Sequence, residues 1–140
     1  MDYKLELVLV PVTDVDRAKA FYTDQAGFVC DVDHRAGDDF RVVQLTPPGS
    51  ACSISVGVGI TNAEPGSVTG MHLVVTDIVA AHDELTGRGV TVSNIRHMGA
   101  NGWQPGPHPE RADYGSFADF RDPDGNTWVL QEARRGEPAA

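Results

Sequence analysis

The chain has 140 residues, of which 41% are hydrophobic and 22% charged, which is ordinary for one compact domain or for two fused half-size modules. Its 11 basic and 20 acidic residues give a formal net charge of −9. This charge argues against nucleic-acid binding, because phosphate contacts require clustered Lys and Arg. No apolar run approaches the roughly 20 residues of a membrane span, so we expect no membrane partner.

The acidic balance has two interpretations. It either favours cationic small ligands through long-range attraction or only keeps the protein in solution. The N-terminal segment MDYKLELVLVPV carries acidic residues where a secretory signal is basic, and no small-residue cleavage site follows it, so we expect a cytoplasmic protein. Cys30 and Cys52 lie in strand-like segments, where buried free thiols are favoured over a disulfide.

The sequence repeats one order of elements. LVPVTDV at 9–15 and HLVVTDI at 72–78 are apolar runs that end in Thr-Asp, and each leads into a segment with helical periodicity. Asp14 and Asp77 are placed to cap these helices, because their carboxylates can accept from the free amides of the first turn. Glycines in QAGF and GRGV predict where the helices end.

Three strand-like segments follow each helix. They read GFVCDVD, FRVVQL and TPPGSACSISVGV in the first half, and GVTVSNI, GSFADF and DPDGNTWVLQE in the second. The sequence therefore predicts an α+β fold of two tandem βαβββ modules, at about 4–59 and 70–133. A linker at 60–69 joins the modules, and the C-terminal RRGEPAA is expected to be a frayed tail.

DPDGNTWVLQE, residues 122–132, begins with a turn signature. Pro in its second position and Gly in its fourth suit a type I turn whose first Asp accepts backbone amides. A calcium loop counted from Asp122 would need Gly and Glu where Thr127 and Ala133 stand. We therefore interpret the stretch as a hairpin turn with TPPGSACSIS as its counterpart, which aligns Ser53 with Val129.

VPVTDVDRAKAFY (10–22), HLVVTDIVAAHDEL (72–85) and DPDGNTWVLQE make the chain resemble the vicinal oxygen chelate superfamily, which includes glyoxalases, extradiol dioxygenases and bleomycin-resistance proteins. The resemblance covers nearly the whole chain. It implies a single glyoxalase-like domain in which the two modules form a curled mixed sheet around a cleft. It also implies a homodimer, because members of the superfamily often pair two chains.

The resemblance also indicates where metal-dependent members carry their ligands, a His or Gln on the opening strand and a Glu on the last strand of each half. These places fall on Leu7, Gly70, Ser53 and Val129, none of which is a good ligand for a divalent cation. A catalytic metal site needs about three protein donors. We therefore expect no metal, no other cofactor and no catalytic residue, as in the bleomycin-resistance branch.

The former ligand places outline the wall of the expected cleft, and strand alternation adds their neighbours. We expect the ligand to contact Leu7, Leu9, Ser53, Ser55, His72, Trp103, Tyr114, Val129 and Gln131. The alternative is that the strand residues only fill the core. His72 is either a polar handle or a hydrogen-bonded core histidine. Cys52, Trp128 and Leu130 are expected to face the helices as core, whereas Phe40 could face either way.

The segment 95–116 is expected to be a long irregular loop, of the length usually associated with function or disorder. Its Trp103 either stacks over a flat or cationic ligand or anchors the loop to its own domain. Its His97 and His108 are expected to be solvated. Neither their spacing nor any nucleophile beside them indicates catalysis.

Three functions remain open from the sequence. The favoured one is a metal-free binding protein that sequesters a bulky aromatic or cationic natural product, of the bleomycin, mitomycin or enediyne class. The second is a metal-dependent lyase, isomerase or dioxygenase of the same superfamily. The third is metal-free acid–base catalysis by His72 with Gln131.

Overall fold

The computed structural model describes residues 1–134 and confirms the α+β class, with a βαβββ order of elements in the first half. The first half contains β1 (Leu7–Leu9), α1 (Val15–Ala20), the π-helical turn η1 (Phe21–Gln25), β2 (Val29–Arg35), β3 (Arg41–Thr46) and β4 (Ser53–Val58). The second half contains β5 (Met71–Val75), α2 (Ile78–Gly87), β6 (Arg96–Gly99), β7 (Gly102–Pro105), β8 (Ser116–Arg121) and β9 (Thr127–Glu132). Most of the expected tail, from residue 135 onward, lies outside the described residues.

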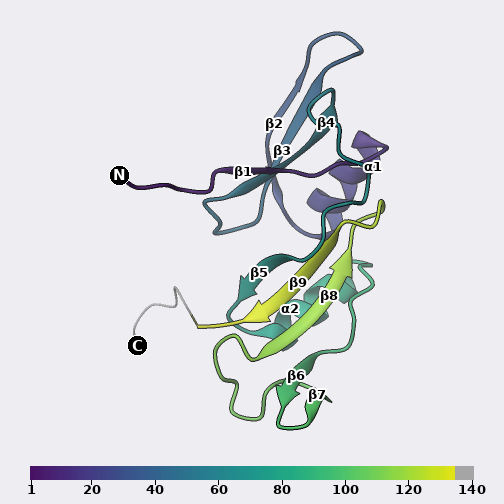
Figure 1. Ribbon diagram of the computed structural model, residues 1–140. Coiled ribbons are helices and arrows are strands. Elements are labelled where there is room, and N and C mark those ends of the chain that lie inside the picture. Colours follow the sequence, from purple (N-terminus) through teal and green to yellow (C-terminus); the bar gives the residue numbers. More distant parts are fainter. Residues whose placement is uncertain (135–140) are drawn as a thin grey trace. The chain divides into compact units, whose positions relative to one another are not determined.

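The chain divides into two compact units (Figure 1). Unit 1 comprises Met1–Thr69 together with Asp122–Asn126, and unit 2 comprises Gly70–Arg121 and the chain from Thr127 onward. The short turn between β8 and β9 therefore belongs to unit 1, although both strands that it joins belong to unit 2. No helix within residues 1–134 is long and apolar enough to cross a membrane.

Unit 1 is a four-stranded mixed sheet in the order β1-β4-β3-β2, with one helix on one of its faces (Figure 1). Strand β1 runs parallel to β4, and the other pairs are antiparallel. Alternation along β3 and β4 buries one side-chain set of each strand against the helix. The resulting core holds Val43, Leu45, Ile54, Val56, Ala18, Phe21 and Tyr22.

Unit 2 repeats this design with five strands in the order β5-β9-β8-β6-β7, and β5 runs parallel to β9. Trp128 and Leu130 are buried on the face that also holds Phe120, whose ring stacks on Trp128 with centroids 6.1 Å apart. Ile78 and Leu85 of α2 are buried as well. The expectation that Trp128 and Leu130 are packing residues is confirmed.

The expected helix ends are also confirmed. Asp14 accepts from the backbone N–H of Arg17 at 3.0 Å, and Asp77 accepts from two first-turn amides of α2 at 3.1 Å. Both segments end near glycines in the left-handed region, Gly27 at φ 80° and Gly89 at φ 90°. The first helix continues beyond α1 as the π-helical turn η1, which the sequence did not indicate.

The expected strand GVTVSNI is wrong. Residues 89–95 are not a strand, and β6 begins only at Arg96. The segment 95–116 is correspondingly not irregular throughout, because β6 and β7 form a hairpin in which Gly99 pairs with Gly102. Ala100 and Asn101 form the two-residue turn of this hairpin, and Gly102 begins β7. The Asn101-Gly102 pair is the local turn signal in this segment.

The cysteines are free, as expected, but half-buried rather than buried. Cys30 lies on the edge strand β2, and Cys52 lies just before β4 begins. Cys30 is directly opposite the core residue Leu45 and so shares its side of the sheet, but its place on the edge strand leaves the thiol in partial contact with solvent.

The turn after β8 is organised by one buried carboxylate. Asp122 accepts through Oδ1 from the backbone N–H groups of Asp124 and Asn126, both at 3.0 Å. Its Oδ2 accepts from the Tyr22 hydroxyl and from Asn126 Nδ2, both at 2.8 Å. The Gly125 N–H closes the turn on the Asp122 carbonyl at 3.0 Å. The expected hairpin turn is confirmed, and its first aspartate is fully engaged by protein donors.

Asn126 joins the same turn to the rest of unit 1. Its Nδ2 donates to the carbonyl of Pro11 at 2.9 Å, and its Oδ1 accepts from the Val68 N–H at 3.1 Å. Asp124 accepts from the backbone N–H and the hydroxyl of Thr13 at 3.1 and 2.7 Å. The turn is therefore part of the folded body of unit 1.

Replacing Asp122 with Ala should destabilise the protein by about 3 kcal/mol, because it removes the carboxylate that accepts from the Tyr22 hydroxyl, the Asn126 side chain and two backbone amides. Urea unfolding followed by circular dichroism measures the change. Ser50→Ala in the exposed counterpart turn is the control and should stay within about 0.5 kcal/mol of the parent. Equal losses in both variants would contradict the role given to Asp122.

A second buried carboxylate organises unit 2. Glu132 accepts from Arg111 Nε at 2.8 Å and Nη2 at 2.6 Å, and its Oε2 also accepts from the N–H of Ile78 at 2.9 Å. The hydrogen bonds from Arg111 hold the pKa of Glu132 below its usual value, against the opposing effect of burial. The pair thus connects the end of β9 to the first residue of α2.

Because the folded-state pKa of Glu132 is depressed, its contribution to stability is present above the ordinary value of 4.5 and is lost as the pH falls through the folded-state pKa. Glu132→Gln should cost about 2 kcal/mol near neutral pH. The difference from the parent should shrink as the pH is lowered below about 4.5, as measured by urea unfolding at several pH values. A difference that stays constant down to pH 3 would contradict this account.

Candidate ligand-binding surfaces

In each unit, the sheet face opposite the helix carries most of the residues expected to contact a ligand. Strand pairing defines its members, because directly opposed residues point to the same side. The unit 1 face consists of Leu7, Leu9, Val42, Gln44, Thr46, Ser53 and Ser55. The unit 2 face includes His72, Val74, Arg96, Phe117, Asp119, Thr127, Val129 and Gln131. Trp103 belongs to the same face because its ring contacts the side chains of Arg96 and Phe117.

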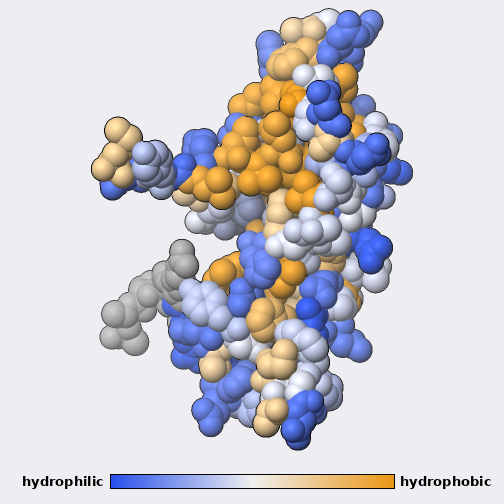
Figure 2. All heavy atoms as spheres, in the orientation of Figure 1, coloured by the Kyte–Doolittle hydropathy of each residue, from blue (hydrophilic) through white to orange (hydrophobic). Residues whose placement is uncertain are grey.

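The unit 1 face is largely apolar at its exposed positions. Leu7 and Leu9 are 38% and 40% exposed, and Val29 and Val32 of the edge strand β2 are exposed as well. Apolar side chains accordingly gather over β1 and its neighbouring strands in the space-filling view (Figure 2). A monomeric protein seldom leaves such side chains together in water without a use for them.

Between these leucines and β3 lie the two buried serines, Ser53 opposite Leu7 and Ser55 opposite Leu9. The Ser53 hydroxyl is 2.6 Å from the Thr46 hydroxyl and 3.5 Å from Gln44 Nε2. Within the described residues, the Ser55 hydroxyl has no hydrogen-bond partner. The sequence indicated both serines but missed Gln44 and Thr46, which share the face through cross-strand pairing.

The unit 2 face holds an aromatic and charged cluster around Trp103. The Arg96 guanidinium lies 4.8 Å from the Trp103 ring centroid, and the Phe117 ring meets Trp103 edge-on with centroids 5.3 Å apart. Arg96 also forms an ion pair with Asp119 at 2.8 Å. Trp103 is therefore anchored to its own unit, yet it remains 50% exposed.

Arg96, Phe117 and Asp119 were not expected at this surface. Because the strand was expected at 89–95, Arg96 was not expected to lie in a strand. The pairing of Arg96 with Phe117 could therefore not be deduced. The alternation of GSFADF was the available signal, because it places Phe117 and Asp119 on one face.

His72 lies on the exposed edge strand β5, so the core-histidine alternative is wrong. Its Nδ1 is 2.7 Å from the carbonyl oxygen of Gly70. Val129 is directly opposite His72 in the sheet, whereas Gly70 precedes β5. His72, rather than Gly70, thus stands beside Val129 in the way that Leu7 stands beside Ser53.

Gln131 and Tyr114 are joined to each other. Gln131 Nε2 donates to the Tyr114 carbonyl at 3.1 Å, and the Tyr114 N–H donates to the Glu132 carbonyl at 2.6 Å. Tyr114 holds a left-handed φ of 63° and exposes part of its ring. Gln131 therefore positions the loop before β8, and its amide points toward that loop.

A hollow of about 540 Å³ adjoins the unit 2 face at its Val129 end. Polar groups of Asp119 and Arg121 share its wall with apolar parts of Val92 and Val129. Its size falls within the range of small-molecule sites. Asp119 lines this hollow and also pairs with Arg96 of the Trp103 cluster.

The family places for metal ligands do not hold a metal-binding set. Leu7, Ser53 and Val129 offer no donor suited to a divalent cation, and His72 is a single imidazole. Among residues 1–134, no three His, Cys, Asp or Glu side chains come together in a way that could hold a metal ion. The residues at these places therefore do not fit the metal of the metal-dependent relatives.

His97 and His108 are half-buried rather than solvated, which corrects the sequence expectation. Their ring centroids lie 5.9 Å apart. Nδ1 of His97 is 2.8 Å from the Gly106 carbonyl oxygen, and Nδ1 of His108 accepts from the N–H of Glu110 at 3.1 Å. Both imidazoles thus hold the segment after β7 in place.

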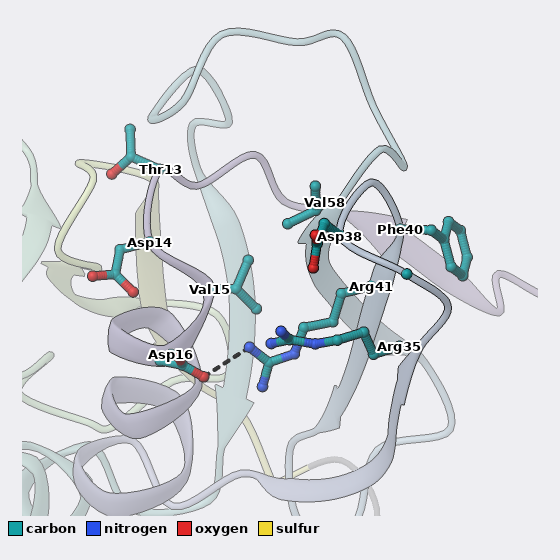
Figure 3. A pocket seen from close by; sticks show the side chains of 10 residues that line it. Thr13, Asp14, Val15, Asp16, Arg35, Asp38, Phe40, Arg41 and Val58 are labelled. Atoms are coloured by element: carbon teal, nitrogen blue, oxygen red, sulfur yellow. Dashed lines mark hydrogen bonds and ion pairs between the residues drawn. The ribbon is translucent and has the colours of Figure 1, made fainter.

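A second hollow, of about 340 Å³, lies in unit 1 near the start of α1 (Figure 3). Arg41 dominates its wall, pairing with Asp33 at 2.9 Å and with Asp16 at 2.7 Å. The hydrogen bonds to Asp33, followed by the one to Asp16, raise the pKa of Arg41. The same hydrogen bonds from Arg41 lower the pKa of Asp33. The Phe40 ring points away from the hollow (Figure 3). We assign this cluster to the packing of unit 1.

Comparison with known proteins adds to this geometry. The family model described as "Glyoxalase/Bleomycin resistance protein/Dioxygenase superfamily" matches residues 4–130. TnmS3, an antibiotic binding protein from Streptomyces sp. CB03234, is 31% identical, with 94% of this chain and 96% of that chain covered and a TM-score of 0.72. A glyoxalase/bleomycin resistance protein from the same organism is 32% identical, with 91% and 99% covered and a TM-score of 0.69. The uncharacterized protein YetH of Bacillus subtilis is 26% identical over 89% of this chain and 94% of its own length.

Proposed function

The chain belongs to the glyoxalase/bleomycin resistance protein/dioxygenase superfamily, and from this premise we propose that it is a metal-free binding protein that sequesters a bulky aromatic natural product of an antibiotic class. Bleomycin, mitomycin and enediyne compounds are the candidate ligands. The observation that carries the proposal is the half-exposed Trp103, braced by Arg96 and Phe117 in a unit that also contains a hollow large enough for a small molecule. The 31% identity to an antibiotic binding protein supports it.

The unit 2 face offers the means of binding such a ligand. Trp103 is braced by Phe117 and Arg96, so its exposed surface is presented with little conformational freedom left to lose. A rigid aromatic platform binds flat apolar rings by stacking at a low entropy cost. The hollow beside Val129 can receive the parts of the ligand that extend beyond the platform.

The same cluster favours an aromatic ligand over a cationic one at Trp103. The Arg96 guanidinium already lies over the indole at 4.8 Å, so a cation–π contact is made within the protein. A cationic ligand group on the indole would lie close to the positive charge of Arg96, and the ion pair with Asp119 only partly offsets that repulsion. We therefore assign the stacking position to a neutral ring and place any cationic group of the ligand elsewhere.

We further propose that the two units act as one domain, that two chains pair as a homodimer, and that the protein works in the cytoplasm. The edge strand β2 supports pairing, because Val29 and Val32 are exposed on it and its unpaired edge is open to a second chain. A sequestering protein must also meet its ligand before the ligand reaches an intracellular target.

Titration with bleomycin, mitomycin and enediyne compounds should quench the fluorescence of Trp103 at micromolar concentrations for at least one class. The chain has two tryptophans, and Trp128→Phe isolates the signal of Trp103 while keeping an aromatic ring in the wall of the hollow, so this variant is the reference for the affinity. Trp103→Ala should weaken binding about 10-fold, the size of one aromatic stack. Failure of the whole panel to bind would count heavily against the proposal.

The competing function, a metal-dependent enzyme, is decided by elemental analysis of protein purified without chelator. One equivalent of metal per chain, lost together with an activity on EDTA treatment, would replace the binding proposal. Acid–base catalysis by His72 with Gln131 is disfavoured by the Gln131 amide, which is hydrogen-bonded to Tyr114.

Sedimentation velocity should find two chains in the parent protein and one in Val32→Glu, because a buried unpaired carboxylate at the pairing surface is costly. Val79→Glu, at a similarly exposed apolar residue on α2, is the matched control and should remain paired. A parent that sediments as one chain, or a Val32→Glu variant that still pairs, would remove the homodimer from the proposal.

A further inference from the structure

We propose that the unit 1 face contains a polar anchor that selects ligands carrying a hydroxyl group, with Gln44 and Ser55 contacting that hydroxyl. This inference rests on the proposed binding function and specifies the chemistry of a ligand held by the unit 1 face alone. It follows from the direction of one hydrogen-bond chain, from one buried hydroxyl without a partner, and from one irregularity in β2.

The chain runs from Asp31 through Thr46 and Ser53 to Gln44. An ionised carboxylate only accepts, so the Thr46 hydroxyl donates to Asp31. Thr46 then accepts from the Ser53 hydroxyl at 2.6 Å, and Ser53 accepts from Gln44 Nε2 at 3.5 Å. Each donor is directed toward Asp31, which leaves Gln44 Oε1 as an acceptor at the far end of the chain.

The Ser55 hydroxyl supplies the second feature. Ser55 is fully buried, lies directly opposite both Gln44 and Leu9, and has no hydrogen-bond partner within the described residues. A buried hydroxyl without a partner lowers the stability of the free protein. A ligand that displaces the exposed Leu9 side chain can reach it, through a rotamer change of the kind that is common on binding.

The third feature is the irregularity between Cys30 and Val32, where the register of β2 against β3 shifts by one residue. Asp31 is the extra residue, and its carboxylate reaches Thr46 across the strands. Bulges of this kind often re-aim a side chain next to a functional site. Here the shift sets the direction of the hydrogen-bond chain, which makes Asp31 a positioning residue.

These features together define the ligand group. A hydroxyl can donate to Gln44 Oε1 and accept from the Ser55 hydroxyl, so it satisfies both. An ether oxygen or a methoxy group has no hydrogen to donate and leaves Gln44 Oε1 without its partner. Sites built around such polar groups reject analogues that cannot complete the hydrogen bonds.

The test compares 1,5-dihydroxynaphthalene with 1,5-dimethoxynaphthalene by isothermal titration calorimetry. The dihydroxy compound should bind at least about 10-fold more tightly, the effect of one unmade hydrogen bond. Asp31→Asn should reduce that preference to within about 3-fold, because an amide can donate to Thr46 and so releases the direction of the chain. Asp39→Asn is the control for loss of charge in the same hairpin and should keep the full preference.

A ligand-free measurement tests the buried hydroxyl separately. Ser55→Ala should raise the melting temperature by about 3 °C, because it removes an unpaired buried group. Ser116→Ala is the matched control and should lower it, since the equally buried Ser116 hydroxyl accepts from the His108 N–H at 2.8 Å. A destabilising Ser55→Ala would overturn the role given to Ser55.

Two results separate this inference from the function on which it rests. Equal affinity for the two naphthalenes would overturn the hydroxyl anchor and leave aromatic binding intact. No binding of either compound, together with no binding of any antibiotic in the fluorescence titration, would overturn both.

Discussion

The fold of unit 1 depends on one buried carboxylate. Asp122 takes four hydrogen bonds, two from backbone amides of its own turn and two from the side chains of Tyr22 and Asn126. Because a buried charge is tolerated only when its oxygens are fully paired, these donors have to be in place together. That requirement fixes the turn against η1 and against the strand-end segment at Pro11. Glu132 acts in unit 2 by the same physics, with Arg111 and the first amide of α2 as its donors.

Because the cores and the buried carboxylates stabilise the two units, most residues on the sheet faces opposite the helices are not needed for packing. The helix-side faces hold the cores, and the charged groups that stabilise the fold are engaged by protein donors there or at the turns. What remains on the other faces is a mixture of half-exposed leucines, a braced tryptophan and hydroxyl groups. Such a mixture binds organic molecules well, because apolar contact supplies affinity and a few polar groups supply orientation.

The sequence was sufficient for the architecture because each element carried its own local signal. The capping aspartates, the terminal glycines and the alternation in β3, β4, β8 and β9 all agreed with the fold. The prediction failed at GVTVSNI, whose apolar alternation is typical of a strand although the next strand, β6, begins only at Arg96. The surface around Trp103 was out of reach for a different reason. Its partners Arg96 and Phe117 are brought together by strand pairing, which no short stretch of sequence encodes.

The shared turn also has a consequence for the order in which the chain can fold. Tyr22 and Asp122 are 100 residues apart, and Pro11 and Asn126 are 115 apart, although both pairs lie within unit 1. During synthesis the ribosome delivers the strands and helix of unit 1 long before it delivers the turn that completes them. Unit 1 therefore lacks the contacts of this turn with Tyr22 and Pro11 until nearly all of unit 2 has been synthesised. Unit 1 begins first in the sequence, but its packing is completed last, because residues 122–126 belong to it.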